Sequence, residues 1–216
     1  MIHYLGKNSS LLKQYIAEVR DMEIQKDSLR FRRNLERLGE IFAYEISKQL
    51  KWALRETITS LGTAQCEMLA EQPVIATILR AGLPVHQGIL NYFDRAENAF
   101  ISAYRKHHKN GRFDIQIEYT SCPNLDAKQL IISDPMLATG ASMVLSYKEL
   151  LRHGKPAHTH IVSILASAQG VEYVKRHLPP ADYTLWLGEV DDELTAKAYI
   201  VPGLGDAGDL AFGSKL

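Results

Sequence analysis

A carboxylate, a turn of small residues and two hydroxyl groups follow one another in the segment LIISDPMLATGASM, Leu130 to Met143. Asp134 comes first, and Thr139, Gly140 and Ser142 come after it. Glycine lets the backbone approach a ligand closely, and the hydroxyl groups add hydrogen-bond donors. These residue types favour an anion such as a phosphate group. Because a carboxylate repels a phosphate, Asp134 would face sugar hydroxyls or a Mg²⁺ ion.

The same segment predicts the elements that would position these groups. Leu130 to Ser133 is typical of the end of a buried strand, and Met143 to Arg152 of a helix. Amides exposed at the start of a helix, together with its dipole, attract an anion. Ligands of open α/β sheets bind at this end of a strand. An ordinary strand-to-helix turn with Asp134 as punctuation remains an equal alternative, because short phosphate-loop patterns also occur by chance.

A second strand-turn-helix unit carries a cation at the corresponding place. The apolar run Pro73 to Leu79 predicts a strand, Arg80 follows it, and Val85 to Tyr92 predicts a helix. The guanidinium fork of an arginine can hold a phosphate with two hydrogen bonds. The alternative is a surface arginine. His86 is expected to be hydrogen-bonded or solvated rather than catalytic.

Further strands and helices alternate along the rest of the chain. Strands are expected at 99–103, 113–120, 159–166 and 183–187, and a helix at 168–177. This alternation predicts a mostly parallel sheet that is covered by helices on both faces. The polar segment 106–112 ends in Asn110-Gly111, which predicts a flexible flap between two strands. His158 and His160 would share a strand face, but no acidic or thiol partner supports a metal site there.

The N-terminal residues 9–60 are predicted to be mainly helical. A longer helix after Asp27-Ser28 would bury apolar residues at steps of three and four, namely Leu35, Leu38, Phe42, Ile46, Leu50 and Leu54. The basic run RFRR on this helix favours a solvated face over a phosphate or RNA patch. The chain is therefore expected to form a single domain, 1–216, with a helical N-terminal arm, 1–70, and an α/β core, 71–216.

The composition excludes several function classes. The 216 residues include 25 Lys and Arg and 25 Asp and Glu, which gives a net charge of zero. A general nucleic-acid or membrane surface is therefore not expected. No segment approaches the ~20 apolar residues of a membrane span. Cys66 and Cys122 have no metal or redox spacing, so a reducing cytoplasm is the expected location.

The C-terminal segment Gly203 to Gly208, GLGDAG, satisfies the G-x-G-x-x-G pattern of dinucleotide-binding folds. That fold needs a second strand with an acidic residue ~20 positions further on, and the chain ends too soon for one. Glycines also let backbone amides and carbonyls match the alternating donors and acceptors of a flat base such as uracil. Pro202 and Phe212 argue against the alternative, an unstructured tail.

The segment that contains DPMLATG resembles the phosphoribosyl diphosphate (PRPP) motif of type I phosphoribosyltransferases, in the form found in uracil phosphoribosyltransferases. Pro135 and Ala138 stand where most of the superfamily has acidic residues, which argues against the adenine, hypoxanthine and orotate branches. The segments ILRAGL and YIVPGLGDAGD are similar to the same family. The resemblance covers roughly residues 75–213.

The resemblance implies a type I phosphoribosyltransferase fold and the transfer of phosphoribosyl from PRPP to uracil, which gives UMP and diphosphate in pyrimidine salvage. Mg²⁺ would be carried by PRPP, with no metal ligand from the protein. The implied PRPP-binding residues are Arg80, Arg105, Asp134, Pro135, Met136, Leu137, Ala138, Thr139, Gly140, Ala141, Ser142 and Asp206. The implied uracil-binding residues are Ile200, Gly205, Asp206 and Ala207, and the implied catalytic residues are Asp134, Asp206 and Arg105.

The resemblance also leaves two alternative functions open and implies which partners the protein has. Many members carry Asp-Glu after the arginine at position 105, whereas this chain has Lys106-His107. A phosphoribosyltransferase for another base, or a nucleotide sensor without turnover, therefore stays open. The expected partners are small molecules, with no nucleic acid and no membrane. Because relatives form dimers or larger assemblies, a homodimer or higher homo-oligomer is expected.

Overall fold

The computed structural model describes residues 1–107 and 113–214, without the side chains of 104–107 and 113–115. Its main sheet has the strand order β1-β10-β9-β7-β4-β5-β6, and β8 pairs with β9 beside β7. Neighbouring strands in it run parallel except β5 and β6, which are antiparallel. The strands of this sheet are β1 (Ile2–Tyr4), β4 (Val74–Leu79), β5 (Glu97–His107), β6 (Phe113–Ser121), β7 (Gln129–Ser133), β8 (Met136–Leu137), β9 (His158–Ser167) and β10 (Tyr183–Asp191).

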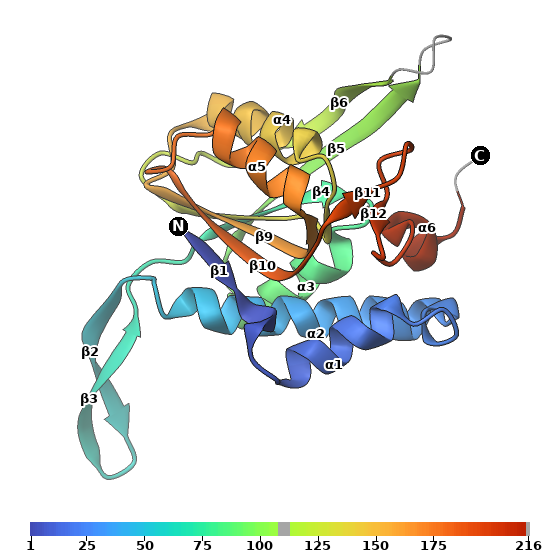
Figure 1. Cartoon of the computed structure of the whole chain (residues 1–216). Helices are drawn as coiled ribbons and strands as arrows, with labels where there is room; N and C mark the ends of the chain where they lie inside the picture. The colour runs from blue at the N-terminus through green and yellow to red at the C-terminus, as the bar shows by residue number, and fades with distance from the viewer. Residues whose placement is uncertain (108–112, 215–216) are drawn as a thin grey trace.

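Helices cover both faces of the sheet (Figure 1). One face packs on α1 (Leu11–Arg20), α2 (Ser28–Ser47) and α3 (Leu83–Tyr92), and the other on α4 (Ala141–Leu150) and α5 (Ala168–His177). The central strands are apolar on both faces because each face is buried, as VIATIL in β4 illustrates. Short 3-10 helices lie at Leu5–Lys7, Ile24–Lys26 and Leu151–His153.

The predicted mostly parallel sheet flanked by helices is confirmed. The predicted helix 168–177 has the same bounds in the structure, where the Ser167 side chain accepts a hydrogen bond from the Gly170 amide and caps the helix. The helix expected from Met143 begins earlier, at Ala141, and the helix expected from Val85 begins at Leu83. Residues 108–112 of the expected flap lie outside the described residues.

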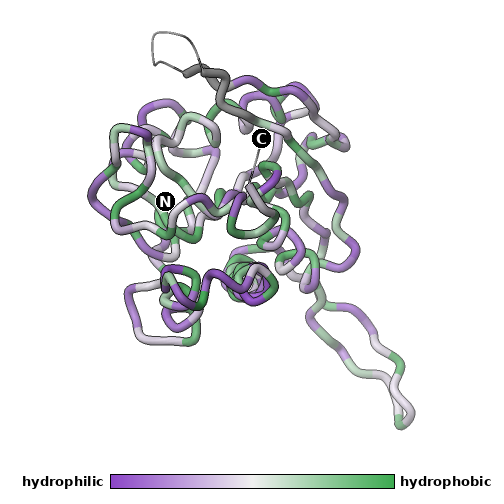
Figure 2. The backbone as a smooth tube through the Cα atoms, turned by 90° about the vertical axis from the view of Figure 1, so that its right-hand side faces the viewer, coloured by the Kyte–Doolittle hydropathy of each residue, from purple (hydrophilic) through white to green (hydrophobic). Residues whose placement is uncertain are grey.

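The N-terminal arm is helical only in part, and the prediction of helix through residue 60 was wrong. Asp27 caps α2 by accepting the amides of Leu29 and Arg30, but the helix ends at Ser47. A β-hairpin follows, made of β2 (Trp52–Thr59) and β3 (Gly62–Leu69). Leu54, expected on the buried helix face, is instead 69% exposed on β2. Figure 2 shows the hairpin projecting from the body of the molecule.

The hairpin departs from the helical pattern for a physical reason. Leu50 and Leu54 continue the step of four, but Trp52, Thr57, Ile58 and Thr59 are aromatic or β-branched residues that favour strands. Gly62 has φ +152 at the turn, a backbone conformation that other residues rarely adopt. None of the described helices is long and apolar enough to cross a membrane.

Candidate active site

Three neighbouring strands bring the predicted phosphate-binding segments to one edge of the sheet. β4 lies between β7 and β5, with Thr77 opposite Ser133 and Leu79 opposite Ser102. Asp134 follows β7 and Arg80 follows β4, so both emerge at the carboxyl edge of the parallel strands. Arg105 lies further along β5, and its side chain is outside the described residues.

Asp134 sits in a tight turn whose backbone is fixed. Its amide donates to the Val162 carbonyl at 3.1 Å, and its carboxylate oxygen Oδ1 accepts the Met136 amide at 3.2 Å. Met136 and Leu137 then form the short strand β8 beside β9, which leads the chain towards α4. The Asp134 side chain is half-buried, so it remains accessible at this edge.

The small-residue loop ends at the N-terminus of α4. Gly140 has φ +78, and a Cβ there would lie 2.7 Å from the Gly170 carbonyl oxygen, so no larger residue fits. The N-cap residue of α4 is Gly140, which has no side chain to cap the helix, and the Ala141 amide donates a long hydrogen bond of 3.4 Å to Thr139 Oγ1. Ser142, also half-buried, lies in the first turn of α4. The geometry leaves a helix N-terminus available for an anion.

Two residues that the sequence reasoning missed support this loop, Ser167 at the end of β9 and Gly170 in the first turn of α5. Ser167 Oγ donates to the Ala138 carbonyl at 2.5 Å while it accepts the Gly170 amide at 2.8 Å. A Cβ at Gly170 would lie 2.4 Å from the Ala138 carbonyl oxygen, so a glycine lets α5 approach the loop. The Ser-x-x-Gly spacing signals a helix cap but not its contact with a segment far away in the sequence.

Arg80 joins the first phosphate-binding turn to the C-terminal segment. Its guanidinium donates from one nitrogen to Asp209 Oδ1 at 3.0 Å and to the Gly213 carbonyl at 3.2 Å. The turn itself is compact, because a Cβ at Gly82 would lie 2.0 Å from Thr77 Oγ1. Asp209 is a third residue that sequence reasoning missed, because its spacing within GLGDAGD gave no signal of a partner at Arg80.

The C-terminal segment, taken from here on as residues 200–213, consists of a strand, a loop and a helix. Ile200 begins β12 (Ile200–Val201), which pairs with β11 (Glu193–Leu194), and Gly205 has φ +96 in the following loop. Asp206 caps α6 (Ala207–Phe212) by accepting the Asp209 amide at 3.0 Å. Ile200 and Ala207 are buried, so of the predicted base-binding residues Gly205 and Asp206 are the more accessible. A helix does begin within the G-x-G-x-x-G pattern, but no strand follows it in the described chain.

His86, His158 and His160 lie apart from this edge, nearer the amino ends of the strands. His86 is buried and its Nε2 lies 2.7 Å from Asn98 Oδ1, while burial lowers its pKa. His158 bonds Thr184, and Trp186 donates to His160 Nδ1 at 3.0 Å. The described residues contain no group of three or more His, Cys, Asp or Glu side chains that could hold a metal ion.

Comparison of the sequence with known proteins identifies the family of this chain. The sequence model of the family described as uracil phosphoribosyltransferase matches residues 7–214. A uracil phosphoribosyltransferase of Porphyromonas gingivalis is 55% identical over 213 residues, which cover 99% of this chain and 98% of the relative. The chain belongs to the uracil phosphoribosyltransferase family.

A more distant relative and a solved structure also match most or all of the chain. A uracil phosphoribosyltransferase of Methanothermobacter thermautotrophicus is 40% identical over 189 residues, with 87% of this chain and 85% of the relative covered. The solved structure of the AQ2163 protein from Aquifex aeolicus is similar over 100% of both chains, with a TM-score of 0.87 and 29% identity. The sheet, the helices and the N-terminal arm therefore belong to one shared fold.

Proposed function

We propose that this chain transfers the phosphoribosyl group of PRPP to uracil and releases UMP and diphosphate. The observation that carries the proposal is the pairing of Arg80 with Asp209, which joins an arginine turn suited to a diphosphate to the glycine-rich segment suited to a base. The small-residue turn after β7 lies beside them, because β7 is the neighbour of β4. Family membership supports the same activity.

Different residues would bind the ribose, the 5′-phosphate and the diphosphate of PRPP. The Asp134 carboxylate accepts hydrogen bonds from ribose hydroxyls, and the loop 138–142 with the N-terminus of α4 holds the 5′-phosphate. Arg80 and Arg105 neutralise the diphosphate as it leaves, with Arg80 exchanging Asp209 for the phosphate oxygens. Since displacement at the anomeric carbon develops positive charge on the sugar, orientation and charge neutralisation provide most of the catalysis.

The base is read by the segment 200–207. Backbone amide and carbonyl groups at Ile200, Gly205 and Ala207 match the donors and acceptors of uracil, and Asp206 is the candidate to receive its N1 proton. Gly205 suits this role because φ +96 and the absence of a side chain keep its backbone open. The nearest atom to a Cβ at Gly205 would be Leu210 Cδ1 at 4.0 Å, so the side of Gly205 is not filled by protein.

Mg²⁺ would arrive with PRPP. Mg²⁺ keeps several waters and binds phosphate oxygens readily, so it needs few protein ligands. The half-buried Asp134 carboxylate fits such an ion, because it can hold the ribose hydroxyls or waters around it. When bound, the ion supplies positive charge to the leaving diphosphate.

The hairpin β2–β3 supports a homodimer or larger homo-oligomer. Leu54 and Ile58 share one face of β2 and are 69% and 88% exposed. A cavity of about 500 Å³ at the base of the hairpin is lined in part by Tyr44, Trp52 and Tyr92. Apolar surface of this kind is expected to pack on a second copy. The two free cysteines fit a cytoplasmic protein.

The direct test is the conversion of labelled uracil. The purified protein should form UMP only when PRPP and Mg²⁺ are both present, with no product when either is omitted. Binding of uracil and PRPP without turnover would contradict the proposal and favour a nucleotide sensor. Turnover with another base and none with uracil would reassign the substrate.

A further inference from the structure

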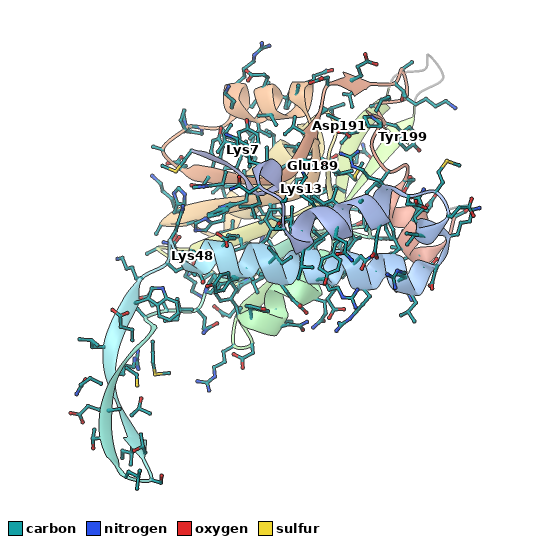
Figure 3. All side chains as sticks on the ribbon, turned by 60° about the horizontal axis from the view of Figure 1, so that its bottom comes forward. Lys7, Lys13, Lys48, Glu189, Asp191 and Tyr199 are labelled. Atoms are coloured by element: carbon teal, nitrogen blue, oxygen red, sulfur yellow. The ribbon has the colours of Figure 1, made fainter. Side chains whose placement is uncertain are left out.

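An ion pair between the N-terminal arm and β10 holds the C-terminal segment by its backbone. Arg20 is the last residue of α1, and its guanidinium donates to both carboxylate oxygens of Asp191 at 2.8 Å. The same guanidinium donates to the Gly203 carbonyl at 3.0 Å and to Glu189 Oε2 at 3.1 Å. Figure 3 shows Glu189 and Asp191 on β10 near α1.

Both backbone polar groups of Gly203 are hydrogen-bonded by this ion pair. Asp191 Oδ2 accepts the Gly203 amide at 3.0 Å, while Arg20 binds the Gly203 carbonyl at 3.0 Å. Gly203 has φ +53, and a Cβ there would lie 2.1 Å from the Ile200 carbonyl oxygen. Position 203 therefore excludes a side chain, and only its backbone is available to be held.

The ion pair between Arg20 and Asp191 is largely buried, so water weakens it little. The side chains of Arg20 and Asp191 are 19% and 9% exposed. Burial opposes the charge of Asp191, but the hydrogen bonds from Arg20 and the Gly203 amide outweigh it and lower the pKa of that carboxyl. Charge-assisted hydrogen bonds in such a site are stronger than neutral ones and fix geometry as well as energy.

Two further arm residues hold the same segment. With its amide nitrogen turned towards them, Gln25 donates to the carbonyls of Leu204 at 2.9 Å and Val19 at 3.2 Å. Arg32 of α2 donates to the Ala211 carbonyl at 2.6 Å, and its guanidinium lies 5.9 Å from the Phe212 ring centre. The segment is thus fixed at 203, 204 and 211, on either side of the predicted base-binding residues Gly205, Asp206 and Ala207.

We infer that Arg20 is a positioning residue for the base: by fixing Gly203 against Asp191, it sets where the backbone of residues 204–207 meets uracil. This inference rests on the proposed base-reading role of that segment. Arg20 bonds Asp191, Glu189 and Gly203 and neither the Asp134 turn nor the loop 138–142. Of the implied PRPP-binding residues only Asp206 lies in the segment that Arg20 positions, so the main effect is expected on the base. The N-terminal arm is in this way part of the specificity of the enzyme.

The test compares the two substrates in one variant. Arg20→Met keeps the aliphatic stem and removes the guanidinium, so the KM for uracil should rise roughly 10-fold, the scale of one lost hydrogen bond. The KM for PRPP should stay within about twofold, because Arg80, Asp134 and the loop 138–142 are not displaced. Arg20→Lys, which keeps the charge but cannot make all the hydrogen bonds of the fork, should lie between the wild type and Arg20→Met.

Arg33→Met is the matched control, because Arg33 is an exposed arginine of α2 that pairs with Glu36 and does not contact the segment. Its kinetics should equal those of the wild type. An unchanged uracil KM in Arg20→Met, or equal increases in the KM values of both substrates, would overturn the inference. If Arg20→Met does not fold, Arg20→Lys carries the same comparison.

Amide hydrogen exchange separates this inference from the proposed function. In the full-length protein without substrates, Gly203 to Gly205 should exchange faster in the Arg20 variants than in the wild type. This result requires no activity, so it stands even if the wild type makes no UMP. Equal exchange rates in wild type and variants would show that Arg20 does not hold the segment.

Discussion

Asp134 carries the clearest prediction at the scale of single residues. Asparagine at this position keeps a carbonyl oxygen that can accept the Met136 amide, now at 3.2 Å from Asp134 Oδ1. It loses the negative charge that favours ribose hydroxyls, so Asp134→Asn should lower kcat/KM for PRPP by ~10²-fold, about 2.7 kcal/mol. Steady-state kinetics and the melting temperature test this together. A variant with normal turnover and a much lower melting temperature would assign Asp134 a structural role in the turn.

The lowered pKa of His160 predicts how the stability of the fold depends on pH. Burial, followed by the nearby His158 and His3, lowers the pKa of His160 from 6.5 to about 3. The unfolded chain therefore binds a proton on this residue below pH 6.5, whereas the folded protein does not. Its contribution to stability is complete above pH 6.5, and it falls by about 1.4 kcal/mol per pH unit as the pH drops towards the folded value.

Urea unfolding at pH 7.5 and pH 5 measures this effect, with His160→Gln as the comparison. The wild type should lose more stability over this interval than the variant, because only the wild type has a buried imidazole at position 160. Trp186 donates to His160 Nδ1, so protonation would also break that hydrogen bond. Equal losses in the two proteins would show that His160 does not titrate differently in the folded state.

At the scale of elements, the sequence predicted the helices and strands whose ends are set by neighbouring residues. The helix 168–177 is bounded by the Ser167 cap and by Pro179-Pro180, and both signals are written in the adjacent sequence. The hairpin was missed because Leu50 and Leu54 continue the helical spacing of α2, although nothing buries Leu54. The contact of Arg20 with Gly203 spans 183 residues and could not be read from either segment alone.

The same contrast applies to the candidate site. The residues Asp134, Gly140 and Arg80 stand out because strand, turn and helix signals surround them. The pairing of Arg80 with Asp209 and the support of Ala138 by Ser167 depend on how distant elements pack, which no local spacing encodes.

The hairpin gives a prediction about assembly. On β2, Leu54 and Ile58 lie on one face and Thr57 on the other, because successive side chains of a strand alternate. If the apolar face packs on a second copy, Leu54→Lys with Ile58→Lys should convert the oligomer to a monomer, while Thr57→Lys should leave it intact. Light scattering after size-exclusion chromatography measures the mass of each. A monomeric wild type, or a double variant that keeps the wild-type mass, would contradict this role.

At the scale of the whole molecule, the arm, the sheet edge and the C-terminal segment form one unit. The sheet edge presents Asp134 and Arg80, and Arg80 reaches the segment through Asp209. The arm holds the same segment through Arg20 and Arg32. The substrates are thus expected to be handled by separate surfaces that one packed framework aligns, with PRPP at the sheet edge and uracil on the segment.

The selectivity for the base tests this account most directly, through kcat/KM for uracil and for cytosine with saturating PRPP and Mg²⁺. Cytosine carries an amino group in place of one carbonyl and lacks the N3 proton, so a backbone amide and a backbone carbonyl would each face a group of the same polarity. In a dry pocket each mismatch costs roughly 1–3 kcal/mol, so uracil should be preferred by at least ~10²-fold. Comparable values for the two bases would show that the C-terminal segment does not read the base.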